Sequence, residues 1–147
     1  FRSLACFLAK IVKKMYSYDI RDDHLEVIRK NKQFLQLSNL HITKGDIYEG
    51  LSQKDVDVII LDVPEPWKAL KSAASSLKIG GYLVSYSPHI PQTVDMVNIL
   101  RESDVFFYEN TLEINEREWE ISGRKVRPRP SRIGHSGFLS FSRLISR

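Results

Sequence analysis

The chain has 147 residues, of which 42% are hydrophobic and 27% charged, an ordinary balance for one globular domain with its own core. No apolar run approaches the roughly 18 residues of a membrane-spanning helix, so no membrane partner is expected. Cys6 is the single cysteine, which excludes an internal disulfide and fits a reducing, cytoplasmic setting.

The net charge of +4 is unevenly distributed. Residues 1–116 carry 14 Lys or Arg and 16 Asp or Glu, whereas residues 117–147 carry 8 and 2, a local excess of +6. Such a basic segment is the electrostatic footprint of a phosphate-rich partner. A solvated basic loop is the alternative, and charge alone does not decide between the two.

The first half of the chain alternates short apolar runs with longer helical periods. Strands are predicted over Met15–Ile20 and His41–Lys44. A helix with an acidic first turn is predicted between them, over Asp22–Leu37. The continuous apolar run Val56–Leu61 is typical of a strand buried on both faces.

The second half continues the alternation and closes with two strands. The predicted elements are a helix over Trp67–Leu77 with a glycine cap in 78–81, a strand over Tyr82–Tyr86, a helix over Pro91–Ser103, and strands over Phe106–Glu113 and Gly137–Leu144. The polar, basic segment 116–134 is predicted to be a long connecting loop. Together these elements predict one α/β domain over 1–147, doubly wound, with a mostly parallel sheet and an antiparallel last strand.

Acids and polar turns follow the predicted strands. Asp19 ends the first, Gly45-Asp46 the second, Asp62 the third and Ser85–Ser87 the fourth. In open α/β sheets, ligands bind at the carboxyl ends of the strands, where an acid can accept hydrogen bonds from ribose hydroxyls. Aspartate at a strand end is also a common cap or turn residue, but three together favour a nucleoside cofactor.

The turn Leu61–Trp67 is the most informative segment. Two prolines flank Glu65, so the turn is stiff and presents Asp62 and the ring of Trp67 at the sheet edge. A carboxylate beside a rigid aromatic surface suits a flat heterocycle that carries an amino group. The alternative is a strand-to-helix turn with Trp67 in the core. The four histidines lack the spacing of metal ligands, so no metal site is expected.

In this order along the chain, seven segments resemble the tRNA (adenine-N1)-methyltransferases in their archaeal form. The segments are Tyr16–Arg21, Gly45–Gly50, Leu61–Trp67, Gly80–Pro88, Arg117–Trp119, Arg127-Pro128 and His135–Leu139. The resemblance implies a Rossmann-like class I methyltransferase fold, S-adenosyl-L-methionine as cofactor, and tRNA as substrate. It also implies a T-loop adenosine as the target, at position 58 and in some members 57, and a homotetramer.

The resemblance also implies residue roles. Asp19 with Ile20 matches the cofactor's ribose site, and Gly45, Asp46 and Ile47 match the surroundings of its adenine ring. Asp62 matches the catalytic acid, next to both cofactor and target base. The expected substrate-binding residues are Pro64, Trp67, Tyr86, Gln92, Arg127 and His135.

One part of the family pattern is not found. The glycine-rich loop that cradles the cofactor would fall at or before Phe1, because Ser3–Ala9 resemble the helix that follows it. The central first strand and a small N-terminal domain are therefore also expected to be absent from 1–147. Three alternatives to an active tRNA methyltransferase stay open: a non-catalytic tRNA-binding or assembly subunit, an inactive fragment of the same fold, and a class I methyltransferase acting on protein or a small molecule.

Overall fold

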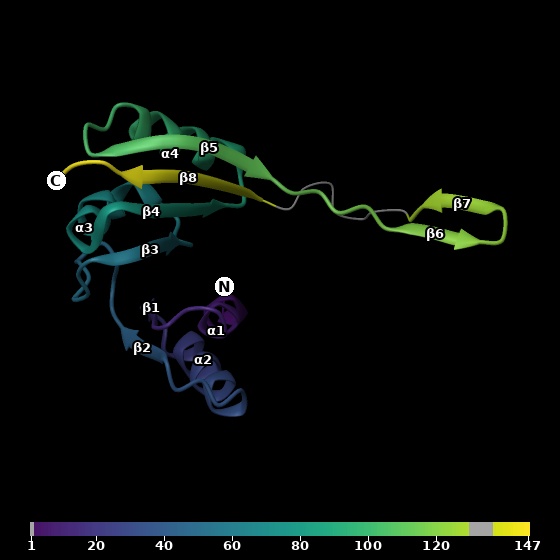
Figure 1. The fold of residues 1–147 in the computed structure, drawn as a ribbon, viewed down its shortest axis with the longest axis horizontal. Coiled ribbons are helices and arrows are strands. Elements are labelled where there is room, and N and C mark those ends of the chain that lie inside the picture. Colours follow the sequence, from purple (N-terminus) through teal and green to yellow (C-terminus); the bar gives the residue numbers. More distant parts are fainter. Residues whose placement is uncertain (1, 130–136) are drawn as a thin grey trace. The chain divides into compact units, whose positions relative to one another are not determined.

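The computed structural model describes residues 2–129 and 137–147. The chain divides into two compact units, Phe1–Leu51 and Ser52–Arg147. Figure 1 labels the helices and strands of each. In the described residues no helix is long and apolar enough to cross a membrane.

The first unit is a parallel strand pair with its helices. Its elements are α1 (Arg2–Ala9), β1 (Met15–Asp19), α2 (Asp22–Phe34) and β2 (Leu40–Lys44). β1 and β2 pair in parallel, from Met15 opposite Leu40 to Asp19 opposite Lys44. Parallel strands need a crossover connection, and α2 supplies it. The core of this unit consists of Ala5, Cys6, Ala9, Ile28, Leu37 and Leu40.

α2 is shorter than predicted, although β1 and β2 lie within one residue of their predicted ends. The helix ends at Phe34 because Gln36 adopts a left-handed backbone, with a φ of 53°. The backbone N–H of Leu37 donates to the carbonyl of Lys32, and its side chain packs into the core. Leu37 is therefore a core residue that lies beyond the end of α2. Its sequence spacing from the apolar residues of α2 matches a further helical turn, which explains why the predicted helix was too long.

The second unit contains a four-stranded sheet in the order β3-β4-β8-β5. β3 (Val56–Leu61) runs parallel to β4 (Leu77–Ser87), whereas β8 (Phe138–Leu144) is antiparallel to both β4 and β5 (Phe106–Glu113). The prediction of a mostly parallel fold with an antiparallel last strand is confirmed. The remaining helices of this unit are η1 (Pro66–Ala69), α3 (Leu70–Ser76) and α4 (Ile90–Arg101).

Two predictions for this sheet were wrong. β3 is not buried on both faces: Ile59 and Leu61 are buried, but Val58 is 50% exposed and Ile60 36%. The predicted helix 67–77 is instead a 3-10 turn followed by a short α-helix that ends without a glycine cap. Leu77 is extended, fully buried and paired with Val56, so it begins β4 rather than ending the helix.

The segment predicted as a loop contains a β-hairpin. Its strands are β6 (Trp119–Ser122) and β7 (Lys125–Pro128), joined by a turn in which Gly123 has a φ of 59°. Pairing places Ile121 opposite Val126 and Trp119 opposite Pro128. Because side chains alternate along a strand, these four form one apolar face of the hairpin. Trp119, Ile121 and Val126 are more than half exposed on it.

Candidate active site

The carboxyl end of β1 presents a fixed carboxylate. Asp19 Oδ1 accepts a hydrogen bond from the backbone N–H of Arg21 at 2.9 Å. Asp19 Oδ2 lies 2.8 Å from Nδ1 of His24, in the first turn of α2. The carboxylate is only about a quarter exposed, whereas the neighbouring Ile20 is largely exposed. An acid held in this way can accept further hydrogen bonds without losing its orientation.

The charges around Asp19 are already arranged. The guanidinium of Arg21 binds Asp23, with Nη2 2.7 Å from Oδ2, and these hydrogen bonds lower the pKa of the Asp23 carboxyl. Both groups are exposed, so the pair adds little to stability. The Arg21 side chain is thus bonded to Asp23, whereas the Asp19 carboxylate is bonded to the Arg21 backbone N–H and the His24 imidazole.

The residues after β2 lie beside Asp19. The backbone N–H of Gly45 donates to the Asp19 carbonyl at 3.2 Å, so the ends of β1 and β2 are tied together. Asp46 forms a turn in which its Oδ1 accepts the Tyr48 N–H at 2.9 Å. Asp46 and Ile47 are half-buried. The structure therefore brings together all five cofactor-site residues predicted in this unit: Asp19, Ile20, Gly45, Asp46 and Ile47.

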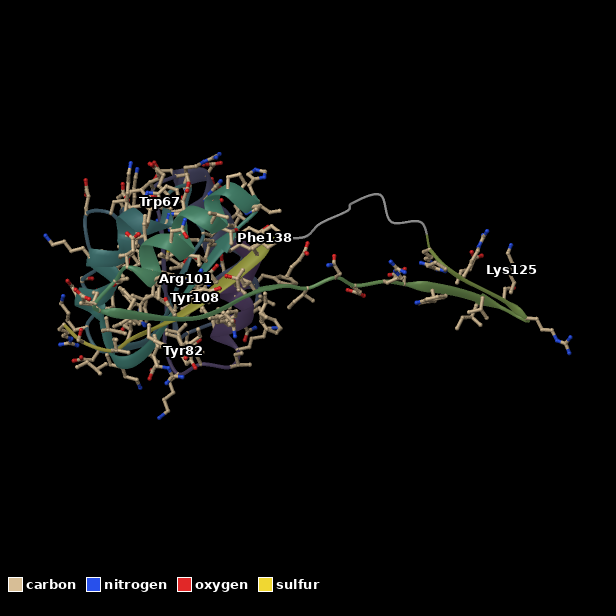
Figure 2. All side chains as sticks on the ribbon, turned by 90° about the horizontal axis from the view of Figure 1, so that it is seen from above. Trp67, Tyr82, Arg101, Tyr108, Lys125 and Phe138 are labelled. Atoms are coloured by element: carbon tan, nitrogen blue, oxygen red, sulfur yellow. The ribbon has the colours of Figure 1, made fainter. Side chains whose placement is uncertain are left out.

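In the second unit, Asp62 follows β3 on a constrained turn. The side chain of Asp62 is exposed, Pro66 is buried as the first residue of η1, and Trp67 is half-buried. Lys68 Nζ binds Glu65 at 2.6 Å, and its backbone N–H donates to the Glu65 carbonyl. Trp67 is labelled in Figure 2. Its exposure is intermediate between the two predicted placements, a core residue and an aromatic ring presented at the sheet edge.

Gln92 on α4 contacts this same turn. Its Nε2 donates to the carbonyls of Val63 and Pro64, at 3.1 and 2.7 Å. The second unit therefore brings Asp62, Pro64, Trp67 and Gln92 into one neighbourhood, at the carboxyl end of β3.

Tyr86 lies near the end of β4 beside Gly137. Gly137 has a φ of 146°, and a Cβ atom there would lie 2.5 Å from Tyr86 Cε2. Only glycine leaves this space for the ring. Neither Gly137 nor His24 was singled out from the sequence. His24 was detectable as an imidazole in the first turn of the helix that follows a strand-end acid, but the close approach of Gly137 and Tyr86 carries no local signal.

Arg127 lies on the polar face of the hairpin. It pairs with Glu120 directly across the strands at 2.8 Å, and Arg129 pairs with Glu118 at 2.7 Å. No ion pair involving Arg124 or Lys125 is found in the described part of the chain, and Figure 2 shows Lys125 on this hairpin. The strongest unneutralised charge of the hairpin is therefore at its turn. His135 lies outside the described residues.

No group of three or more His, Cys, Asp or Glu side chains that could hold a metal ion occurs within 2–129 and 137–147. Residues 3–129 match the family described as "tRNA methyltransferase complex GCD14 subunit". The chain belongs to this family.

Two relatives carry related names. One is the tRNA (adenine(57)-N(1)/adenine(58)-N(1))-methyltransferase TrmI of Methanocaldococcus jannaschii, which is 35% identical over 89% of this chain and 56% of its own length. Another is the tRNA (adenine(58)-N(1))-methyltransferase TrmI of Thermus thermophilus, 37% identical over 92% of this chain and 55% of its own length. The chain thus spans a little over half the length of these relatives.

The fold is that of a class I methyltransferase. An S-adenosylmethionine-dependent O-methyltransferase from Thermotoga maritima superposes with a TM-score of 0.90. It is 26% identical, and the superposition covers 99% of this chain and 56% of the other. The fold class predicted from the sequence is confirmed.

Proposed function

We propose that residues 1–147 belong to the catalytic domain of an S-adenosylmethionine-dependent tRNA methyltransferase that modifies N1 of a T-loop adenosine. The target is position 58, with or without the neighbouring position 57 that the name of the relative from M. jannaschii includes. The observation that carries the proposal is Asp62, exposed on a proline-flanked turn at the carboxyl end of β3, in a chain of this family. Ligands of open α/β sheets bind at that edge.

The residues of the first unit fit the cofactor. A carboxylate oxygen can accept two hydrogen bonds, and each oxygen of Asp19 has one protein partner, so each retains capacity for a ribose hydroxyl. Asp46 Oδ1 is held by its own turn, and the carboxylate retains capacity to accept from a further donor such as an adenine amino group. Ile47 is half-buried and supplies apolar surface for a flat ring.

Asp62 is suited to stabilise charge on the target base. When bound, S-adenosylmethionine would supply an electrophilic methyl group, and its sulfur would leave as a neutral thioether as the methyl carbon bonds to N1. Adenine N1 is unprotonated at neutral pH, so no strong base is needed to expose its lone pair. Bond formation at N1 leaves the ring positively charged, and the Asp62 carboxylate accepts a hydrogen bond from the exocyclic amino group as that charge develops. The remaining acceleration comes from alignment of the reactants.

Access to the base requires it to leave the tRNA stack. Trp67 and Tyr86, half-buried near the ends of β3 and β4, offer aromatic surface to an extruded base. On the hairpin, Arg124 and Lys125 are the cations that would bind tRNA phosphates. Arg127 would contribute less, because Glu120 partly neutralises it. His135 remains a proposed member of the target pocket.

We also propose a homo-oligomer, a tetramer by resemblance, in a reducing cytoplasm. An isolated two-stranded hairpin is marginally stable in water, and here its apolar face is exposed at Trp119, Ile121 and Val126. A second copy of the chain is the occupant that would cover this face. Light scattering of the full-length protein and of a Trp119→Ser, Ile121→Ser variant tests this: the variant is expected to dissociate, and an unchanged mass contradicts it.

A second candidate is a methyltransferase that acts on oxygen. The T. maritima structure bears that name and superposes over nearly the whole chain. The relatives named for tRNA are more similar in sequence, at 35% and 37% identity, and favour the tRNA substrate. No described feature favours the third candidate, a non-catalytic tRNA-binding or assembly subunit.

The test is a methyl-transfer assay of the full-length protein with radiolabelled cofactor. Three kinds of acceptor are tested separately: a tRNA transcript, a protein mixture and small hydroxylated molecules. Label in tRNA, recovered as N1-methyladenosine and lost in Asp62→Asn, is the expected result. Label in the other acceptors alone supports the O-methyltransferase. Binding of tRNA without transfer supports the non-catalytic subunit.

A further inference from the structure

The turn that carries Asp62 is fastened to the neighbouring helix by one side chain. Gln92 is the third residue of α4, which begins at Ile90 and is separated by Pro88 and His89 from the end of β4 at Ser87. Its Nε2 donates to the carbonyl of Val63 at 3.1 Å and to that of Pro64 at 2.7 Å. Gln92 thereby links the turn that follows β3 to the helix that follows its parallel neighbour β4.

These two bonds use the full donor capacity of the side chain. An amide nitrogen carries two hydrogens, and both acceptors here are carbonyl oxygens, so the amide nitrogen must face the turn. At the third position of a helix, glutamine commonly reaches back to the backbone of its own N-cap. Gln92 turns instead to a segment 28 residues earlier in the chain. The contact therefore serves the turn rather than the helix end.

The prolines of this turn restrict its backbone but limit its backbone hydrogen bonds. Pro64 and Pro66 have no backbone N–H, so they cannot join a hydrogen-bonded ladder. The bonds between Lys68 and Glu65 fasten its far end to η1. The near end, immediately after Asp62, is held at Val63 and Pro64 by Gln92.

We propose that Gln92 is a positioning residue: it fixes the backbone that carries Asp62, and so sets where that carboxylate is presented to the target base. Sequence resemblance placed Gln92 among residues that line the target pocket, a role that the proposal does not require. The catalytic consequence rests on the proposed methyltransferase function, whereas the structural consequence, a turn held by Gln92, does not.

The variants that isolate this role are Gln92→Met and Gln92→Glu in the full-length protein. Methionine keeps the length of the side chain and removes both donors. Asn98→Met, an exposed amide on the same helix, is the matched control. A displaced catalytic group costs on the order of tenfold to a hundredfold in rate, so Gln92→Met is expected to lower kcat by that factor with little change in KM for the cofactor. Asn98→Met is expected to match the parent protein.

The glutamate variant adds a pH signature. An ionised carboxylate cannot donate to either carbonyl, whereas a protonated one can donate to one of them. The kcat of Gln92→Glu relative to the parent is therefore expected to rise as the pH falls from about 8 toward about 5.5, nearer the range where glutamate gains a proton. For Gln92→Met the same ratio is expected to stay flat.

A readout independent of activity is the fluorine spectrum of protein labelled with 5-fluorotryptophan. Trp67 lies in η1, next to the turn, and Trp119 lies on the hairpin as an internal reference. We expect Gln92→Met to shift or broaden the Trp67 resonance and leave that of Trp119 unchanged. An unchanged Trp67 resonance, or a flat pH ratio for Gln92→Glu, overturns the proposal. If the parent protein transfers no methyl group, the proposed function fails, and the Trp67 resonance still decides whether Gln92 holds the turn.

Discussion

Asp19 and His24 form a polar pair, with Asp19 Oδ2 2.8 Å from His24 Nδ1. The other ring nitrogen, Nε2, is buried and has no hydrogen-bond partner among the described residues; its nearest acid, Asp23, is 4.0 Å away. A carboxylate oxygen can only accept a hydrogen bond, so Nδ1 is the donor in this pair. The ring therefore donates to Asp19 and holds the carboxylate at the end of β1.

Asp19→Ala is expected to weaken cofactor binding. Hydrogen bonds to a charged group contribute about 1.5–3 kcal/mol each, so loss of the carboxylate is expected to raise the Kd by about tenfold to a hundredfold. Calorimetric titration of S-adenosylmethionine into the full-length protein measures it. Asp22→Ala is the matched control, because Asp22 is an exposed acid of the same region that pairs with Lys44. Equal effects of the two substitutions argue against a ribose role for Asp19.

Asp62→Asn is expected to reduce kcat more than it reduces cofactor affinity. The amide is nearly the same size but carries no negative charge to offset charge on the methylated ring. Removal of one electrostatic stabiliser of this kind costs about a hundredfold to a thousandfold in kcat. Single-turnover kinetics measure the rate, and calorimetry the affinity. If Asp62→Asn retains the parental kcat, Asp62 has no catalytic role.

Gly137→Ala is expected to displace the ring of Tyr86. The added Cβ would lie 2.5 Å from Tyr86 Cε2, and the φ of 146° is unfavourable for alanine. Strain of this kind costs about 1–3 kcal/mol, which chemical denaturation can measure as a lower free energy of unfolding. In the Tyr86→Ala background the ring is gone, so the added cost of Gly137→Ala should shrink to the backbone strain alone. Full additivity of the two substitutions contradicts the contact.

Arg124→Gln and Lys125→Gln are each expected to weaken tRNA binding and flatten its salt dependence. Loss of one phosphate contact reduces the slope of log K against log salt by about one. Arg127→Gln is expected to do less, because Glu120 already neutralises that guanidinium. Fluorescence anisotropy with labelled tRNA over a salt series measures the slopes. A larger effect at Arg127 than at Arg124 or Lys125 reverses this ranking.

Cys6 is expected to react slowly with thiol reagents in the folded protein. Burial raises the pKa of the Cys6 thiol, with a smaller opposing effect from Lys10, so less of the reactive thiolate is present at a given pH. The folded state holds this proton more tightly than the unfolded state. Its contribution to stability is thus present below the unfolded pKa of about 8.5 and lost as the pH rises through the higher folded value. Rates of thiol labelling in native and denatured protein, measured across pH, test both the slow reaction of Cys6 and its raised pKa in the folded state.

Sequence patterns predicted the elements whose conformation is set locally. The prolines around Glu65 restrict their own backbone, so the turn after Asp62 was predictable. The acids that end β1 and β2 were predictable for the same reason, because a strand run and a turn residue identify a strand end. The predicted bounds of β3 and β5 were also confirmed.

Features that depend on partners distant in sequence were not predictable. Leu77 reads as the end of a helix until its pairing with Val56 is known, and the exposure of Val58 depends on what packs against its face. The hairpin was missed although it carries a local signal, the alternation of Trp119 and Ile121 before Gly123. The contacts of Gln92 with Val63 and of Gly137 with Tyr86 join residues from different elements, so no single segment reveals them.

The proposed reaction is methylation of N1 of a T-loop adenosine by the full-length protein. Primer extension on tRNA treated with full-length protein and S-adenosylmethionine tests it most directly, because a methyl group on N1 blocks base pairing and stops the reverse transcriptase. A stop is expected at adenosine 58, with or without one at 57, and it should disappear in Asp62→Asn and when the adenosine is replaced by guanosine. Methyl incorporation without a T-loop stop, or a stop that persists in Asp62→Asn, would contradict it.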